Sequence, residues 1–497
     1  MKNMKKIVAL LLATVMVMAM SISVFAAGTG SITIKNTAIG ETYSIYKVLD
    51  ATTNATGGID YKAPIPEGLT DYLEATTITK DGKTYDVIGK KAGVEDADLF
   101  AALKTWADGQ TATDSKVADA NTVEFTNIAA GYYVVISSQG TTVMVDSATN
   151  PAAEIYEKNT TEIVNEGKTA DGTSYSIGDT ITYTAKFLTT NYTGTGENAK
   201  QVYKYEIADT LPEYLSNVNV TSIIVDADAD AATTDDQTNV TAQFSGKKIT
   251  LDWVDANGKS LYKNGAEIIV TYTATLTSTV NVNANNTNTI SITPLDKDGK
   301  PSQEPLEDTA VITTYAAALK KTDGTKALAG AKFKFNGLTV TAGDEAGVYI
   351  VSAFDPESTT PGTEMSTDAN GMLYIIGLGE DVTLTGIETV APDGYNKLES
   401  TFTMPAQKLE EEVITTSGTR YYDEDGNLVS EQSETTTSKT VEKNLSDLDA
   451  TGVEVVNNAG AELPSTGGIG TTLFYVAGSI LVIGAAVLLI SKKRMAR

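Results

Sequence analysis

The side chains that could do chemistry in this 497-residue chain are of few types, because the sequence contains no histidine and no cysteine. Without histidine, Ser-His-Asp and Cys-His catalysis are impossible, and so are zinc sites of the usual Cys/His kind. Without cysteine, no disulfide can stabilise the fold. The reactive side chains that remain are lysines, carboxylates, tyrosines and serines. The composition therefore argues against an enzyme that acts on an external substrate, and we expect no bound metal and no cofactor.

The most informative group of residues lies at the C-terminus. It contains a Leu-Pro-x-Thr-Gly pentapeptide made of Leu463, Pro464, Ser465, Thr466 and Gly467. An uncharged apolar run over residues 473–490 follows, long enough to span a bilayer as a helix, and a basic tail after it would stay in the cytoplasm. This order over residues 463–497 resembles the cell-wall sorting signal of Gram-positive surface proteins. The resemblance implies that a sortase cuts between Thr466 and Gly467 and transfers the threonine carbonyl to an amine; an ordinary single-pass anchor is the alternative.

A second group of residues lies in the region 316–460. Lys321 stands near its start, Glu388 opens the segment Glu-Thr-Val-Ala-Pro-Asp-Gly-Tyr, and Asn457 stands just before the sorting signal. This arrangement is similar to the B-type domains of collagen-binding proteins, found in Gram-positive adhesins and pilins, whose acidic E-box would contain Glu388. The resemblance implies an intramolecular isopeptide bond between Lys321 and Asn457, assisted by Glu388. The alternative is that Lys321 and Asn457 are ordinary surface residues.

Burial would give these residue types the reactivity that such a bond needs. Desolvation disfavours charged forms, so a buried lysine can be a neutral nucleophile and a buried carboxylic acid can stay protonated. The acid could polarise the asparagine carboxamide and move protons as ammonia leaves. One turnover is enough, because the product is a structural amide that joins the first strand of the domain to its last.

The region 160–315 has a similar layout with weaker motifs. Lys168 lies near its start, Asp209 in its middle, and Asn288 in a closing run rich in Thr and Ile. The layout resembles the A-type isopeptide domain of the same proteins, which implies a bond between Lys168 and Asn288 with Asp209 as the acid. Glu206 is the alternative acid, and Asn286 is the alternative asparagine.

The junction of the first two regions carries the sequence Ile-Tyr-Glu-Lys-Asn at residues 155–159. It looks like the pilin motif of sortase-assembled shaft subunits, usually Val-Tyr-Pro-Lys-Asn, with Glu157 in place of proline. The resemblance implies that Lys158 of one copy is the acceptor amine for Thr466 of another. Exposed lysines at strand ends are common, so an inert Lys158 is the alternative.

The elements that must position these residues are mostly β-strands. Short runs rich in Thr, Val, Ile and Tyr are separated by Asp-Gly, Asn-Gly and Gly-Gly turns. Runs such as residues 181–187 and 267–273 have the pattern of sandwich strands. We therefore expect tandem immunoglobulin-like β-sandwich domains at residues 28–157, 160–315 and 316–460.

Two of these regions have further local features. In the first, Leu99, Leu103 and Trp106 share one face of an expected helix, and its last strands are expected at 123–128 and 131–137. In the third, the polar stretch 410–446 predicts an inserted hairpin.

Residues 1–27 have the layout of a secretory signal peptide: lysines, an apolar core, then small residues. The formal net charge of −27 argues against nucleic acid as a partner, since that needs a basic surface. Five aspartates lie within residues 226–239, where a calcium site is an alternative to a solvated loop.

The resemblance covers essentially the whole chain and implies the major subunit of a covalent, cell-wall-anchored pilus. Its expected partners are other copies of itself in a head-to-tail polymer, pilus-specific and housekeeping sortases, minor pilins and peptidoglycan. Two alternatives remain open at this point. One is a monomeric wall-anchored adhesin or minor pilin that binds a host ligand, and the other is a surface enzyme with carboxylate chemistry.

Overall fold

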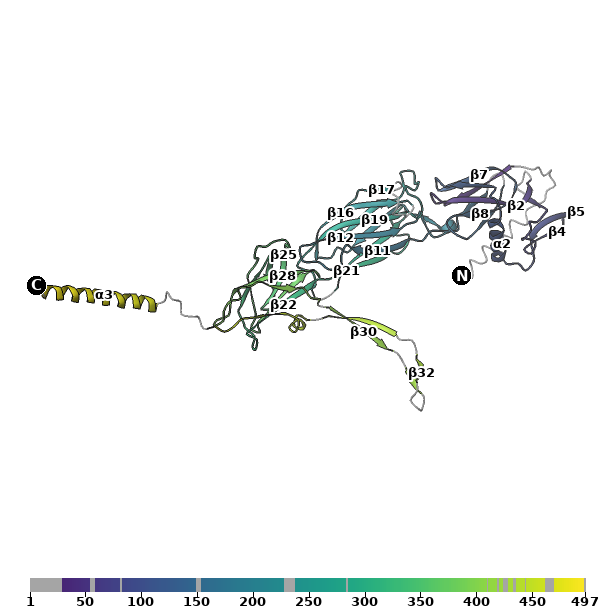
Figure 1. Cartoon of the computed structure of the whole chain (residues 1–497). Coiled ribbons are helices and arrows are strands. Elements are labelled where there is room, and N and C mark those ends of the chain that lie inside the picture. Colours follow the sequence, from purple (N-terminus) through teal and green to yellow (C-terminus); the bar gives the residue numbers. More distant parts are fainter. Residues whose placement is uncertain are drawn as a thin grey trace. The chain divides into compact units, whose positions relative to one another are not determined.

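The computed structural model describes residues 29–53, 59–80, 83–148, 153–227, 237–282, 285–408, 410–417, 420–422, 428–431, 435–442, 444–460 and 469–495. Over these residues the protein is mainly β, as the sequence predicts, with two α-helices, α2 (Asp96–Asp108) and α3 (Ile469–Met495) (Figure 1). The chain divides into two compact units. The first comprises the residues up to 173 together with 179–277 and 285–312, and the second comprises the rest.

The N-terminal strand group, residues 29–156, forms two sheets and a separate hairpin. One sheet has the order β10-β1-β7, the other has the order β3-β2-β8-β9 with β6 also paired to β2, and β4 pairs with β5. The strands are β1 (Thr29–Lys35), β2 (Thr42–Thr53), β3 (Ile59–Lys62), β4 (Leu73–Lys80), β5 (Lys83–Lys90), β6 (Asp114–Val117), β7 (Thr122–Ala129), β8 (Gly131–Ser137), β9 (Met144–Ala148) and β10 (Ala153–Tyr156).

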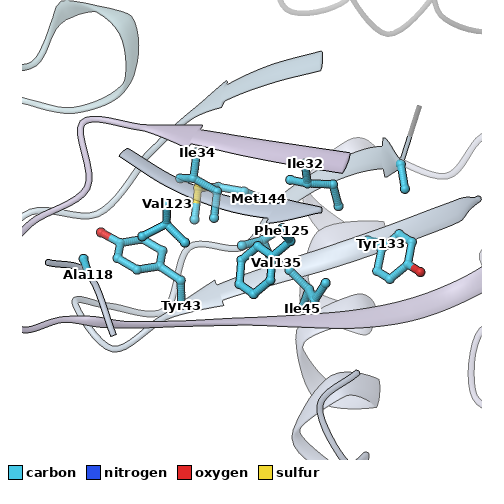
Figure 2. Packing of buried hydrophobic residues seen from close by; sticks show 11 residues of the cluster. Ile32, Ile34, Tyr43, Ile45, Ala118, Val123, Phe125, Tyr133, Val135 and Met144 are labelled. Carbon is cyan, nitrogen blue, oxygen red and sulfur yellow. The ribbon is translucent and has the colours of Figure 1, made fainter. Parts of the chain in front are cut away.

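Alternation of side chains along these strands builds the core of the group. Ile32 and Ile34 of β1 are fully buried because successive side chains of a strand point to opposite faces. Figure 2 shows them packed with Tyr43, Ile45, Val123, Phe125, Tyr133 and Val135. Helix α2 buries Leu99 and Leu103 in a second cluster, with Trp106 packed against it, which confirms the predicted helical face.

The expectation that β8 is the last strand of this group is wrong. Strands β9 and β10 follow it, and β10 pairs in parallel with β1, from Ile32 opposite Ala153 to Lys35 opposite Tyr156. Residues far apart in sequence meet in this ladder, so no local pattern indicated it. The pairing fixes the end of β10, two residues before Lys158.

The central strand group, residues 164–312, contains two larger sheets. Their orders are β11-β12-β19-β16-β17 and β18-β15-β20-β21, and β13 pairs with β14. The predicted strands at 181–187 and 267–273 are confirmed as parts of β12 and β19, which pair with each other along the whole of β12. The strands are β11 (Val164–Ala170), β12 (Thr180–Leu188), β13 (Tyr192–Thr193), β14 (Lys200–Gln201), β15 (Lys204–Asp209), β16 (Leu215–Asp226), β17 (Gln237–Asn239), β18 (Lys248–Asp252), β19 (Glu267–Leu276), β20 (Asn286–Leu295) and β21 (Leu306–Ile312).

The C-terminal strand group, residues 315–456, also has two sheets, with orders β24-β25-β27-β22-β34 and β26-β23-β28-β29. First strand β22 and last strand β34 are neighbours and run in parallel. The strands are β22 (Tyr315–Thr322), β23 (Lys332–Phe335), β24 (Leu338–Ala342), β25 (Val348–Phe354), β26 (Met365–Ser366), β27 (Met372–Leu378), β28 (Thr383–Val390), β29 (Phe402–Pro405) and β34 (Val453–Val456).

The predicted hairpin within residues 410–446 is confirmed by two successive antiparallel ladders (Figure 1). Strand β30 (Glu410–Ser417) pairs with β33 (Thr435–Glu442), and β31 (Arg420–Tyr422) pairs with β32 (Leu428–Glu431). The acidic stretch at 228–236 lies outside the described residues.

Candidate functional site

Lys321, Glu388 and Asn457 come together in the C-terminal strand group and are called here the Lys321 centre. Lys321 lies near the end of β22, and Glu388 lies in β28 of the other sheet. Asn457 directly follows β34, and its backbone N–H donates to the carbonyl of Thr322 at 2.9 Å. All three side chains of the centre are buried, with Lys321 at 0% exposure, so the surface-residue alternative is wrong.

The contacts within the Lys321 centre are direct. Lys321 Nζ lies 4.0 Å from Glu388 Oε1 and donates to the Val455 carbonyl at 2.9 Å. The same Glu388 Oε1 accepts a hydrogen bond of 2.9 Å from Asn457 Nδ2, and Glu388 Oε2 accepts one of 2.6 Å from the Leu398 N–H. The carboxyl group thus lies between the amine and the carboxamide.

The electrostatics of this centre favour a reactive amine. Desolvation lowers the pKa of Lys321, and the neighbouring Glu388 opposes that shift. Among the described residues, buried Asn457 Oδ1 has no hydrogen-bond partner, which is costly for a carbonyl oxygen. An amine of lowered pKa, a carboxyl group and a carboxamide are the groups that amide formation with loss of ammonia requires.

Lys168, Asp209 and Asn288 also come together, in the central strand group, and are called here the Lys168 centre. Lys168 Nζ lies 2.7 Å from Asp209 Oδ2, and both side chains are fully buried. Asn288 is 0% exposed and contacts Asp209 through Tyr272: its Nδ2 donates to the Tyr272 hydroxyl at 2.8 Å, and that hydroxyl donates to Asp209 Oδ2 at 2.6 Å. Sequence reasoning missed Tyr272.

The alternative residues for this centre are placed less favourably. Glu206 pairs with exposed Lys248 at 2.7 Å instead of with Lys168. Asn286 is buried on the same face of β20 as Asn288, but it is Asn288 whose carboxamide bonds to Tyr272 and, through Oδ1, to the Thr210 hydroxyl at 3.1 Å. The geometry therefore favours Asp209 and Asn288.

Desolvation lowers the pKa of Lys168 to about 8, and this shift is partly opposed by Asp209. The rings of Tyr183 and Tyr272 lie 5.1 and 5.6 Å from Lys168 Nζ and form the apolar walls around the amine. At any given pH the neutral, nucleophilic fraction of this amine is therefore larger than that of an exposed lysine.

This pKa shift makes a testable prediction about an Asn288→Ala variant, in which Lys168 stays a free amine. Between pH 8 and pH 10 the unfolded chain binds more protons at Lys168 than the folded chain, so stability rises with pH in that window. We expect the free energy of unfolding to rise by about 2 kcal/mol relative to a Lys168→Met/Asn288→Ala control with the same tyrosines. Denaturant titrations at both pH values measure this difference, and equal slopes for the two proteins would contradict it.

The third candidate is the Lys158 loop, residues 157–159, which follows β10. Glu157 is 3% exposed, and its Oε1 accepts the N–H groups of Lys158 and Asn159, both at 2.8 Å, and Asn159 Nδ2 at 2.9 Å. The Glu157 N–H donates to the Lys35 carbonyl at 3.0 Å, which extends the β10–β1 pairing. Asn159 makes two further bonds with the Thr142 backbone, of 2.9 and 2.8 Å. The side chain that replaces the motif's proline thus fixes the loop by hydrogen bonding.

Within this fixed loop Lys158 is exposed to solvent. Its amine lies over the ring of Phe100 from α2, 5.7 Å from the ring centre. Desolvation lowers the pKa of Lys158, which increases the fraction of nucleophilic amine. The loop therefore presents an accessible lysine on a rigid backbone.

The two segments in which the sequence predicts processing fall largely outside the described residues. Residues 1–27 and the pentapeptide at 463–467 lie there. Helix α3 is described, and its Phe474–Arg494 portion is long and apolar enough to cross a membrane, with a mean hydropathy of 2.3. Lys492, Lys493 and Arg494 lie in its last turn.

Two family models match parts of the chain. A model described as the LPXTG cell wall anchor motif matches residues 455–496, and one described as the SpaA prealbumin-like fold domain matches residues 316–420. The second match contains Lys321 and Glu388, and the first contains Asn457 and the pentapeptide. No curated protein matches the chain significantly.

Several solved structures are similar to the chain. The pilus 2b backbone protein of group B streptococcus is 25% identical, with 60% of this chain and 100% of that one covered and a TM-score of 0.38. The T6 backbone pilin of serotype M6 Streptococcus pyogenes is 15% identical (88% and 100% covered, TM-score 0.38), and the major pilin RrgB of Streptococcus pneumoniae is 13% identical (87% and 100%, TM-score 0.41). Because these TM-scores are below 0.5, no functional conclusion is drawn from the structural similarity. Conclusions about function rest on the motifs and on side-chain geometry. The anchor motif and the apolar helix with its basic last turn make the chain a cell-wall-anchored surface protein with a SpaA-type prealbumin-like domain.

Proposed function

We propose that the chain is the shaft subunit of a covalently polymerised pilus anchored in the cell wall. A sortase cuts between Thr466 and Gly467 and joins the Thr466 carbonyl to the Lys158 amine of the next copy. The observation that carries this proposal is the Lys158 loop, in which a buried carboxylate holds an exposed lysine of lowered pKa in a fixed backbone. The chain carries the donor motif near its C-terminal end and this acceptor at the junction of its first two regions, so head-to-tail joining gives an open filament instead of a closed ring.

Internal amides are the second part of the proposal. In the Lys321 centre, Nζ attacks Cγ of Asn457, the bond from Cγ to Nδ2 breaks, and Glu388 transfers a proton so that nitrogen leaves as ammonia. The Lys168 centre forms the same bond between Lys168 and Asn288. Each amide would join the first strand of its group to a strand at or near the end of that group, so that pulling force passes through covalent bonds instead of sheet hydrogen bonds.

The proposed domains are the three sandwich regions at 28–157, 160–315 and 316–460, with a signal peptide before them and the sorting signal after them. The partners are sortases of the pilus-assembling and housekeeping kinds, minor pilins and peptidoglycan. The protein's own chemistry is limited to these single-turnover bonds, so it acts as a structural element and not as an enzyme.

The intact mass of the mature chain, residues 28–466, tests the internal bonds. We expect a mass lower than the calculated one by two molecules of ammonia, because each amide releases one. Lys321→Ala and Lys168→Ala should each restore one, whereas Lys320→Ala, which changes the exposed neighbour of Lys321, should restore none. The full calculated mass for the unsubstituted chain would refute both bonds.

Coexpression with a pilus-assembling sortase tests the shaft function. The shaft proposal predicts a ladder of products that survives boiling in detergent. A single wall-linked monomer band would instead favour a monomeric adhesin or minor pilin.

A further inference from the structure

The Lys168 centre contains a hydroxyl group that the Lys321 centre lacks among the contacts described for it. In the Lys321 centre, Glu388 bonds directly to the asparagine Nδ2. In the Lys168 centre, the Tyr272 hydroxyl lies between Asp209 Oδ2 and Asn288 Nδ2, with hydrogen bonds of 2.6 and 2.8 Å. Asp209 Oδ2 is also the atom that contacts Lys168 Nζ, at 2.7 Å. One continuous path of hydrogen bonds therefore joins the nucleophile to the leaving group.

We propose that Tyr272 is a catalytic residue of amide formation in the Lys168 centre, acting as the proton relay from Asp209 to the departing Asn288 nitrogen. This inference rests on the function proposed above for the Lys168 centre. It adds the Tyr272 hydroxyl, which contacts the leaving nitrogen of Asn288, to the lysine, the asparagine and the acid of the centre.

The proton balance of the step is complete without any outside reactant. Neutral Lys168 Nζ attacks Cγ of Asn288 and gives one proton to Asp209 Oδ2. Asp209 passes a proton to the Tyr272 oxygen as Tyr272 gives its own proton to Nδ2, which reverses the direction of both hydrogen bonds. The Nζ–Cγ bond has then formed, the Cγ–Nδ2 bond has broken, and ammonia leaves with nothing oxidised or reduced.

The rest of the carboxamide is held in the orientation that the relay requires. The Thr210 hydroxyl donates to Asn288 Oδ1 at 3.1 Å, on the oxygen where negative charge develops as Nζ attacks. With Oδ1 fixed by Thr210 and Nδ2 fixed by Tyr272, the amide plane cannot rotate without losing both bonds. Both the leaving nitrogen and the developing oxyanion therefore face a hydroxyl.

The Tyr272 ring is itself firmly positioned. It stacks on Tyr183 of β12 with ring centres 5.2 Å apart, and it packs edge-to-face with Phe244 with ring centres 5.4 Å apart. Burial and the nearby Asp209 raise the pKa of Tyr272, so its hydroxyl stays protonated and able to donate. A phenylalanine at this position would keep the ring contacts and remove the hydroxyl together with its bonds to Asp209 and Asn288.

The test compares Tyr272→Phe with Tyr205→Phe, which removes another buried hydroxyl of the central strand group, one that bonds to the Thr190 backbone outside the Lys168 centre. Intact mass of the mature chain is followed over time after purification, and fragmentation assigns each missing ammonia. We expect Tyr205→Phe to lack two molecules of ammonia, as the unsubstituted chain does. We expect Tyr272→Phe to lack one, from the Lys321 centre, with the second lost roughly a hundred-fold more slowly.

Three results would overturn the relay, and they are distinguishable. If Tyr272→Phe loses both ammonia molecules as fast as the unsubstituted chain, the relay is wrong while the proposed amide stands. If the unsubstituted chain itself lacks the Lys168–Asn288 amide, the proposed function of the Lys168 centre is wrong, and the relay is wrong with it. If Tyr272→Phe lowers the melting temperature strongly in an Asn288→Ala background, where no amide forms, the hydroxyl acts on the fold instead of on the chemistry.

Discussion

Replacing Lys158 by alanine is expected to abolish the detergent-stable ladder that the chain forms with a pilus-assembling sortase. The substitution removes the acceptor amine while leaving the Glu157 and Asn159 hydrogen bonds of the loop, which use backbone N–H groups and the Asn159 amide. Because no second lysine occupies this loop, we expect the loss to be complete and the monomer to remain attached to the wall. Immunoblots of boiled wall extracts measure the result.

Two matched variants give this prediction its specificity. Lys158→Arg keeps a cation at the position but supplies a guanidinium that stays charged and is a poor nucleophile, so it should also give no ladder. Lys200→Ala removes another exposed lysine of the same compact unit and should leave the ladder unchanged. An unchanged ladder with Lys158→Ala would refute the acceptor role and favour the monomeric adhesin.

The second large effect is expected on stability, from Lys321→Ala. An amide between residues 321 and 457 closes a loop of well over a hundred residues, which in a chain-entropy treatment is worth about 4–5 kcal/mol. For a domain of this size that corresponds to a melting temperature lower by roughly 10–20 °C. Calorimetry of the mature chain should show the transition of the C-terminal strand group shifted by that amount.

The adjacent Lys320 provides the control for this experiment. It occupies the same strand, but its side chain is exposed whereas that of Lys321 is buried. Lys320→Ala should leave the transition within a few degrees of the unsubstituted protein. Equal melting temperatures for the two variants would mean that the covalent link is absent or does not stabilise the fold.

Much of the fold could be predicted because the spacing of apolar residues within a short segment indicates whether that segment is a strand or a helix. The alternation at 181–187 and 267–273 indicated β12 and β19, and the helical spacing of Leu99 and Leu103 indicated α2. The parallel pairing of β10 with β1 could not be predicted, since it joins residues that are more than a hundred positions apart. For the same reason the sequence did not indicate β10, whereas β9, which pairs with its neighbour β8, was missed although its pairing is local.

Some residues of the candidate sites could be predicted from sequence motifs, and others could not. Motif resemblance named Lys321, Glu388 and Asn457, and the structure places them in direct contact. Tyr272 carried one usable signal, its inward-facing position in an alternating strand, but its contact with Asp209 depends on how two sheets face each other. Glu157 departs from the pilin motif, and the sequence alone gives it no role. In the structure its buried carboxyl group accepts three N–H bonds and so fixes the Lys158 loop.

The most direct test of the shaft function is mass spectrometry of protease-digested pili purified from cell walls. The proposed polymer predicts a branched peptide in which the Thr466 carbonyl is joined to the Lys158 amine. The branch should be absent from cells that lack the pilus-assembling sortase. Finding Thr466 joined to peptidoglycan alone, with every Lys158 peptide unmodified, would contradict the account.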